Sequence, residues 1–375
     1  MVSFLGSIGS FFTSILYIVL AILVLMIMIV IHEAGHYTAG KIFKFKINEF
    51  SIGFGKALFK RTKKNGEVFA IRVVPLGGYC AFEGEDEDNN DNPEAFNNQV
   101  WWKRLIVLFS GAFFNFISAV IFSVALLCVV GSGYSKLETV NIEPSQYVNE
   151  FETLQVGDVV TRVNGEKCSF LNGAFTGLVG QIQDDETVIT LTVQRVENGK
   201  KMTKKVQLRK LQGDVITDEA GQALKDDDGN ILYEYKIGVT ASWKNYNFGQ
   251  SLLRAIPFAC EMAWECLEIF GKLIIGEYSI KQLGGPVTTI NTIASASKVS
   301  MLNLLLLFPL IAVNLAVFNL LPIPALDGAR MVFVLIEGIR RKPINRDLEA
   351  KIHTVGLIAL FALVIIVDIL QMFVF

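Results

Sequence analysis

Four long apolar stretches alternate with polar segments along the chain, and this pattern predicts a protein that crosses a membrane several times. They run from Phe11 to Ile31, from Leu105 to Val130, from Leu302 to about Leu321, and from His353 to the C-terminus. About 20 apolar residues in a helix are enough to cross the hydrocarbon core of a bilayer. We therefore expect a polytopic α-helical membrane protein with about four transmembrane helices.

Two of the intervening segments have strand-like patterns. Between Ile47 and Phe82, short apolar runs are separated by glycines, which predicts a small membrane-associated β-sheet beside the first span. Residues 135–242 are more polar and β-patterned, and about 100 residues is the size of one independent domain. The acidic run from Glu83 to Asp91 predicts a solvated loop. Arg254 to Ile275 has the spacing of an amphipathic helix at a membrane interface.

These elements predict four segments. They are an N-terminal membrane domain (1–132), an inserted extracytoplasmic β-rich domain (133–243), an interfacial helical connector (244–300) and a C-terminal membrane domain (301–375). No Lys or Arg precedes the first span, whereas eight lie between Lys41 and Lys64. Basic residues favour the cytosolic side. The N-terminus, the β-rich domain and the C-terminus are therefore expected outside the cytosol, in a multi-pass protein of the cytoplasmic (inner) membrane.

The composition supports the membrane class and excludes others. Of the 375 residues, 52% are hydrophobic and only 19% are charged, which is too apolar for an ordinary soluble enzyme. The formal net charge is -2, and the basic residues form no single continuous patch, so we expect no nucleic-acid partner. The five cysteines have neither zinc nor redox spacing and are expected to be free thiols.

The most informative motif, His32-Glu33-Ala34-Gly35-His36, directly follows the first apolar run. Residues four apart lie on one helix face, so His32 and His36 can bind one zinc ion while Glu33 stays free as a base. The alternative is a helix end with two interfacial histidines. Two of the chain's three histidines lie here, and polar groups beside a hydrophobic span are costly unless they are used. Both facts favour the zinc site.

A catalytic zinc usually has three protein ligands and one exchangeable water, so a third ligand is expected. His353 and Glu337 also fit a solvated cytosolic boundary, and Asp368 lies toward the outer end of the last span. Asp327 follows an apolar helix that two prolines interrupt. An acid beside broken backbone within a membrane is a candidate functional group, although Asp327 could simply cap a kinked helix. Together with the His motif, zinc ligation is the better explanation.

Several motifs together resemble the site-2 protease family, in the bacterial regulator-of-sigma-E protease branch with a single PDZ domain. They include His32 to His36, Asn319-x-x-Pro-x-Pro-x-Leu-Asp-Gly328, Gly53-Phe54-Gly55 and Gly284-Gly-Pro-Val287. Gly111-Ala-Phe-Phe-Asn115 departs from the family, which usually has proline at the position of Ala112. The departure touches no expected ligand.

The β-rich segment carries its own resemblance. Leu154 to Gly165 is similar to the strand-and-turn signature of PDZ domains, but the carboxylate-binding loop of that family is not recognisable. The resemblance implies contact with a peptide or an ectodomain at a sheet edge.

The family resemblance implies an intramembrane zinc endopeptidase. It would cleave transmembrane segments of single-span membrane proteins in regulated intramembrane proteolysis, for example anti-sigma factors or signal-peptide remnants. His32, His36 and Asp327 would hold Zn2+, and Glu33 would be the catalytic base. The lipid bilayer is then an obligatory partner.

The resemblance also implies substrate-binding residues. The Gly53-Phe54-Gly55 strand would take up an unwound substrate by β-addition, and the side-chain amides of Asn314 and Asn319 would hold its backbone. These amides could equally satisfy carbonyls that the nearby prolines leave free.

Two other functions remain as alternatives. A catalytically idle membrane adaptor would bind partners through the PDZ-like domain, but it gives no reason to retain Glu33 together with three metal ligands. A transporter would use the broken helix as an ion site, but the chain has no internal repeat or second broken helix.

Overall fold

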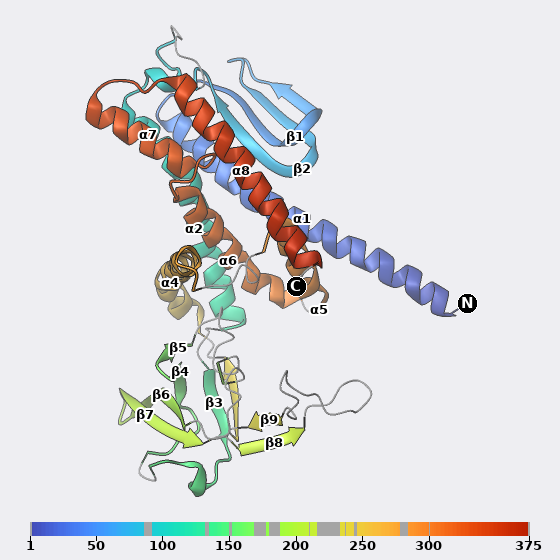
Figure 1. Ribbon diagram of the computed structural model, residues 1–375, viewed down its shortest axis with the longest axis vertical. Coiled ribbons are helices and arrows are strands. Elements are labelled where there is room, and N and C mark those ends of the chain that lie inside the picture. Colours follow the sequence, from blue (N-terminus) through green and yellow to red (C-terminus); the bar gives the residue numbers. More distant parts are fainter. Residues whose placement is uncertain are drawn as a thin grey trace. The chain divides into compact units, whose positions relative to one another are not determined.

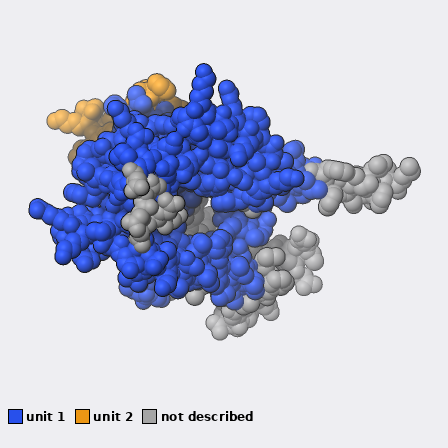
Figure 2. Space-filling view, turned by 90° about the horizontal axis from the view of Figure 1, so that it is seen from above, with its two compact units in different colours: residues 1–125, 252–375 blue, residues 126–251 orange. Residues whose placement is uncertain are grey.

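The computed structural model describes residues 2–85, 92–131, 135–149, 152–168, 178–179, 188–209, 211–215, 233–236, 238–243, 246–277, 284–299 and 301–373. The chain forms two compact units, shown in different colours in Figure 2: residues 1–125 with 252–375, and residues 126–251. Most of the predicted acidic loop, residues 86–91, lies outside the described part of the chain.

Three described helices are long and apolar enough to cross a membrane (Figure 1). The candidate spans are Thr13–Ile42 in α1 (Val2–Ile42), Trp101–Val129, which is the whole of α2, and Arg346–Gln371 in α8 (Arg346–Phe373). The membrane class is therefore confirmed. One difference from the sequence pattern affects the site: α1 continues for 11 residues beyond Ile31, so the His motif lies within the helix and not at its end.

The expected third span coincides with α6 (Met301–Leu320). Its apolar stretch in the described chain, Leu304–Leu320, has 17 residues and extends about 26 Å, less than the ~30 Å hydrocarbon core of a bilayer. The expected number of four spans is therefore not confirmed.

The helices of the first unit share one apolar core. Small and aliphatic side chains of α1, α2 and α6 pack with those of α4 (Phe248–Ile274) and α5 (Pro286–Val299). The side chains that are essentially inaccessible to solvent include Ala21, Met28, Ala119, Ala259 and Ile293. Alanines at these contacts let the helices approach closely, as is typical of helix packing in membranes.

Two long strands, β1 (Ile47–Thr62) and β2 (Val68–Phe82), form a sheet beside α1 (Figure 1). Both strands bend sharply, and β1 does so near Gly53–Gly55. As a result, residues 49–52 of β1 lie between two segments of β2: they pair with 78–81 on one side and with 68–71 on the other. Residues 57–62 pair with 68–72. The outer segments of the sheet are therefore 57–62 at one edge and 78–82 at the other. The short helix η1 (Phe96–Asn98) leads from this region to α2.

A buried carboxylate holds the sheet against α1. The side chain of Glu67 is only 2% exposed and accepts hydrogen bonds from Tyr37 (2.8 Å) and Lys63 (2.6 Å), from Lys41 and from Asn65. Burial alone raises the pKa of Glu67, but these four donors outweigh burial and lower the pKa to about 2. Glu67 is therefore ionised at neutral pH and ties the sheet to the helix that carries the His motif.

The lowered pKa of Glu67 predicts a pH-dependent contribution to stability. A carboxyl group whose pKa falls on folding stabilises the protein fully above its ordinary pKa, near 4.5, and loses that stabilisation as the pH falls toward about 2. Glu67→Gln should lower the thermal midpoint of the protein in detergent at pH 7 by several degrees, and the difference from wild type should shrink between pH 4.5 and 2. A difference that stays constant over this range would contradict the assignment.

The second unit is built around a β-sheet. Its strand order is β10-β3-β4-β6-β7, with β5 pairing β4, and a separate β8–β9 pair completes the described strands. Leu137, Val160, Ile189, Leu191 and Val193 are buried in its core. The elements are β3 (Ser135–Val140), η2 (Pro144–Gln146), β4 (Val159–Val163), β5 (Glu166–Lys167), β6 (Val188–Glu197), β7 (Lys200–Arg209), β8 (Leu211–Val215), β9 (Tyr233–Lys236) and β10 (Val239–Trp243).

Candidate metal centre

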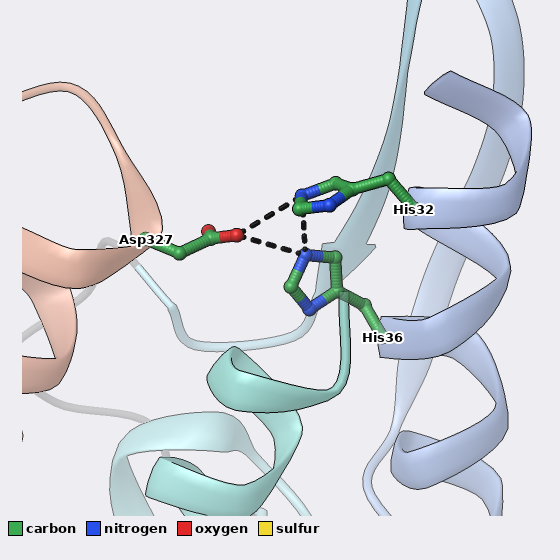
Figure 3. Close-up of side chains that lie close together, drawn as sticks. All are labelled: His32, His36 and Asp327. Atoms are coloured by element: carbon green, nitrogen blue, oxygen red, sulfur yellow. Dashed lines mark hydrogen bonds and ion pairs between the residues drawn. The ribbon is translucent and has the colours of Figure 1, made fainter. Parts of the chain in front are cut away.

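The structure brings together three side chains that the sequence separates by almost 300 residues. His32 and His36 lie on one face of α1, and Asp327 is the first residue of α7 (Asp327–Arg340). Figure 3 shows that the two rings and the carboxylate converge on one point. Oδ2 of Asp327 lies 3.0 Å from Nε2 of His32 and 3.2 Å from Nε2 of His36, and the two Nε2 atoms are 3.1 Å apart.

These distances fit a zinc ion. Ligand atoms about 2.0 Å from a tetrahedral ion are about 3.3 Å from one another, close to all three measured separations. The two histidines are less than 9% exposed, and Oδ2 of Asp327 is buried without a conventional hydrogen bond among the described residues. Three lone-pair atoms facing each other in a buried space repel unless a cation lies between them. The residues therefore fit the metal.

The Nδ1 atoms of the two histidines contact groups on α2 that orient the rings, so that each Nε2 can bind a metal. Nδ1 of His36 donates a hydrogen bond to the carbonyl of Val107 on α2 (2.8 Å), which leaves the lone pair of its Nε2 free. Nδ1 of His32 lies 3.3 Å from Nδ2 of Asn115, whose Oδ1 is buried without a partner in the described structure. Rotating this amide by 180° allows Oδ1 to accept a hydrogen bond from Nδ1 of His32.

Asn115 is a positioning residue that the sequence analysis did not identify, because it lies 83 positions from His32. Asn115→Leu should weaken zinc binding by about 10–100-fold, since the ring of His32 loses the acceptor that orients it. Asn115→Asp, which keeps an acceptor, should retain zinc. Competition with a chromogenic chelator measures both affinities. Equal affinities in the leucine variant and wild type would show that the amide has no such role.

The placement of Asp327 depends on the broken backbone before it. Helix α6 ends at Leu320, and the intervening loop turns through Ala325, which has φ 79°. The N–H of Ala325 donates a hydrogen bond to Nδ1 of His353 on α8 (3.0 Å), so His353 supports the loop and is not one of the converging ligands. A Cβ at Gly328 would lie 2.2 Å from the carbonyl oxygen of Leu321. Only glycine therefore fits after Asp327.

The centre opens into a cavity of about 310 Å³, which Glu33 and Asn319 line together with His32 and Asp327. The carboxylate of Glu33 faces the second edge of the sheet, where it accepts a hydrogen bond from the backbone N–H of Cys80. Burial, together with the charge of Glu33, raises the pKa of the Cys80 thiol well above its ordinary value, so Cys80 supplies no competing thiolate.

Two other predicted substrate-binding groups lie elsewhere. Oδ1 of Asn314 accepts a hydrogen bond from the thiol of Cys266 on α4 (2.6 Å), and Asn314 does not line the 310 Å³ cavity. Gly53-Phe54-Gly55 forms the bend of β1, where Phe54 pairs with Val74 and stacks on the ring of Tyr79. This bend does not line the cavity either.

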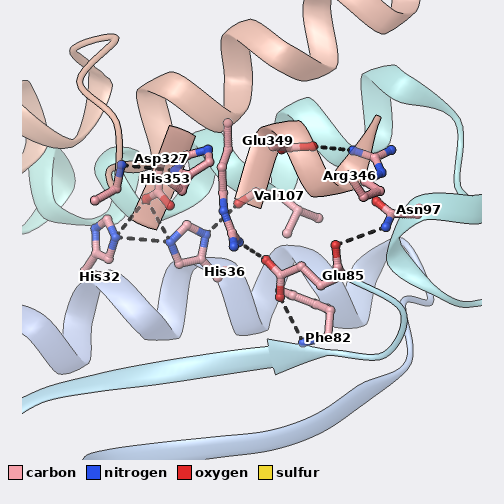
Figure 4. A network of polar contacts seen from close by, with 12 residues as sticks. His32, His36, Phe82, Glu85, Asn97, Val107, Asp327, Arg346, Glu349 and His353 are labelled. Atoms are coloured by element: carbon pink, nitrogen blue, oxygen red, sulfur yellow. Dashed lines mark hydrogen bonds and ion pairs between the residues drawn. The ribbon is translucent and has the colours of Figure 1, made fainter. Parts of the chain in front are cut away.

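A second cavity, of about 490 Å³, also reaches Asp327 and is lined by residues of α2, α7 and α8. Figure 4 shows part of the polar network around it. Glu85 pairs with Arg330, and the buried carboxylate of Glu337 joins Arg104 (2.6 Å) to Arg346 (2.7 Å). Charged and polar side chains of this cavity therefore lie next to Asp327.

Two imidazoles and a carboxylate around one point, a further carboxylate beside them, and helices of membrane-spanning length define a class. It is that of membrane proteins with a metal centre and a free carboxylate beside it.

Comparisons with known proteins give the family. The model of peptidase family M50 matches residues 20–363, and the chain belongs to this family. A protein of Fusobacterium nucleatum named "Putative zinc metalloprotease" is 30% identical over 93% of this chain and 96% of its own length. Proteins with the same description from Clostridium perfringens (28% identical, 94% and 98% covered) and Helicobacter pylori (31%, 86% and 89%) are similar too. The family and these names support Zn2+ as the cofactor.

Proposed function

We propose that the protein is an intramembrane endopeptidase that cleaves the transmembrane segments of single-span membrane proteins, as part of regulated intramembrane proteolysis. One observation carries the proposal: the metal-ligand geometry of His32, His36 and Asp327 involves a helix face inside a candidate membrane span. A peptidase centre at that depth acts on peptide bonds that a soluble protease cannot reach.

The residues of the centre have separate roles in this proposal. When bound by His32, His36 and Asp327, zinc supplies a Lewis acid that makes water nucleophilic near neutral pH and polarises the scissile carbonyl. Glu33 accepts the proton of the attacking water at its carboxylate and returns it to the leaving amine. Asn115 and the Val107 carbonyl keep both imidazoles oriented. The polar cavity near Arg330 delivers water.

The substrate needs an extended conformation, because a helix hides its peptide bonds. We place its binding strand at the sheet edge formed by Gly78–Cys80. This edge lies beside Glu33, and none of the described strands pairs with its outer side. β-Addition there would align a peptide with the centre, and the amide of Asn319 can hold its backbone from the opposite wall of the cavity. The Gly53–Gly55 bend then shapes the sheet and does not itself pair with substrate.

The proposal includes a location and a role for the second unit. The protein is a multi-pass protein of the cytoplasmic membrane, with the metal centre toward the cytosolic side and the N-terminus, the β-rich unit and the C-terminus outside. Among the described strands of the β-rich unit, β10 pairs on one side only, and its other edge suits contact with a peptide or a substrate ectodomain.

The test is cleavage of a model single-span protein by the purified protein in detergent, with the cut site mapped by mass spectrometry and zinc quantified. We expect one zinc per chain and a cut within the apolar segment. The His32→Ala, His36→Ala double variant should contain no zinc and should not cleave. Unchanged zinc content in that variant would refute the metal site. Wild type without zinc would instead support the idle adaptor.

A further inference from the structure

The sheet beside α1 carries a recess that the proposed proteolysis does not use. Its volume is about 630 Å³. Its apolar wall consists of Phe50, Phe59 and Phe69. The ring centroid of Phe69 lies 6.1 Å from that of Phe50 and 6.4 Å from that of Phe59. Arg61 and Lys63 lie at the same recess, together with the carboxylate of Glu67, which is ion-paired with Lys63. Aromatic walls next to cations suit a ligand with an apolar chain and an anionic head.

Apolar surface continues from the recess along the outer part of the sheet. Leu58 is 72% exposed, Phe59 50% and Val73 53%, and Ile71 pairs directly with Phe59. Exposed apolar side chains on an edge segment are an aggregation hazard in water. They are stable when they contact lipid.

The same edge is strongly cationic. Five basic residues and no acidic residue lie between Lys56 and Lys64. Lys63 pairs with Glu67, but Lys56, Lys60, Arg61 and Lys64 form no ion pair within the described structure. Glu67, the nearest acid in the sequence, is buried and already shared by two lysines. The edge therefore has an unbalanced positive charge that attracts anions.

The recess lies close to the end of the candidate membrane span in α1. Tyr37 of α1 lines the recess, and the candidate span ends five residues later at Ile42. At 1.5 Å per residue, the recess lies about 8 Å from the end of the span along the helix axis. Lipid phosphates and the first acyl carbons occupy this level, where aromatic and basic side chains gather.

We propose that this recess binds an anionic phospholipid from the leaflet that surrounds the end of α1. One acyl chain lies against Phe50, Phe59 and Phe69, and the phosphate is held by Arg61, with Lys63 beside it. The exposed apolar edge contacts the neighbouring lipids. This site is separate from the proposed proteolysis and does not depend on the metal.

Native mass spectrometry of the full, zinc-loaded protein tests the site. The protein in detergent is supplied with phosphatidylglycerol or phosphatidylcholine of identical acyl chains, and the retained lipid is counted. We expect preferential retention of phosphatidylglycerol. Arg61→Gln should lower it about fivefold, because one cation near an anionic lipid contributes about 1 kcal/mol. Lys205→Gln removes an exposed charge from the other unit and should leave retention unchanged.

Three results would overturn the proposal. They are equal retention of the two lipids by wild type, equal retention by Arg61→Gln and Lys205→Gln, and displacement of phosphatidylglycerol by millimolar glycerol 3-phosphate, which would indicate a site for free phosphates. Phe59→Ser, which removes part of the apolar wall, should weaken retention of phosphatidylglycerol while leaving zinc content unchanged.

Discussion

Glu33→Gln should bind zinc as wild type does and cleave a single-span substrate at least about 10²–10⁴-fold more slowly, the range expected for loss of a general base. Glutamine has nearly the shape of glutamate, so the cavity and the hydrogen bond from the N–H of Cys80 can persist. The amide, however, cannot accept a proton from water at neutral pH. Zinc content and cleavage rate, measured on the same preparation in detergent, separate the two roles.

A matched control for Glu33→Gln is Glu49→Gln. Glu49 is on the sheet, where it pairs with Arg72 (2.5 Å), and does not line the cavity. The Glu49→Gln variant should bind zinc and cleave the substrate as wild type does. If Glu33→Gln cleaved at the wild-type rate, another group would have to be the base. If it lost zinc, Glu33 would have a structural role in the centre.

The sequence predicted those parts of the centre that depend on helical spacing or on residues that interrupt a helix. A spacing of four places His32 and His36 on one helix face wherever the helix lies, and the broken helix before Asp327 distinguishes this acid from others. The convergence of the three side chains could be predicted only through motif knowledge, because nothing in the local pattern relates residues 36 and 327 in space.

The parts that the sequence analysis missed depend on long-range packing. Asn115 orients His32 from a different helix, and His353, interpreted as a boundary residue, supports the loop before Asp327. The strand pattern of 47–82 predicted a sheet, but not that both strands bend and that 78–82 becomes the edge beside Glu33. The pairing register of bent strands depends on tertiary contacts. The alternation of apolar and polar residues along one strand does not reveal these contacts.

Gly111→Ala should abolish zinc binding although it changes no ligand. Helix α2 passes so close to the His motif that a Cβ at Gly111 would lie 2.4 Å from Nε2 of His36 and 2.7 Å from Cε1 of His32. Real Cβ atoms do not approach other atoms to this distance, so the methyl group must displace both rings or push α2 away. Displaced rings break the ligand triangle, because Nε2 is the metal-binding atom. A displaced α2 removes the contacts of Val107 and Asn115 that orient both rings. We expect zinc affinity to fall by more than about 10²-fold, with cleavage lost in parallel.

Gly271→Ala is the matched control, because apart from the adjoining backbone of α4 no described atom lies within 4 Å of the Cβ position at Gly271. It should leave zinc affinity and cleavage at wild-type values. Zinc affinity is measured by chelator competition, and helix content by circular dichroism shows that both variants are folded. A Gly111→Ala protein with wild-type zinc affinity would mean that α2 lies farther from the His motif than the structure places it. The metal centre would then depend on α1 and α7 alone, without the wall that α2 provides.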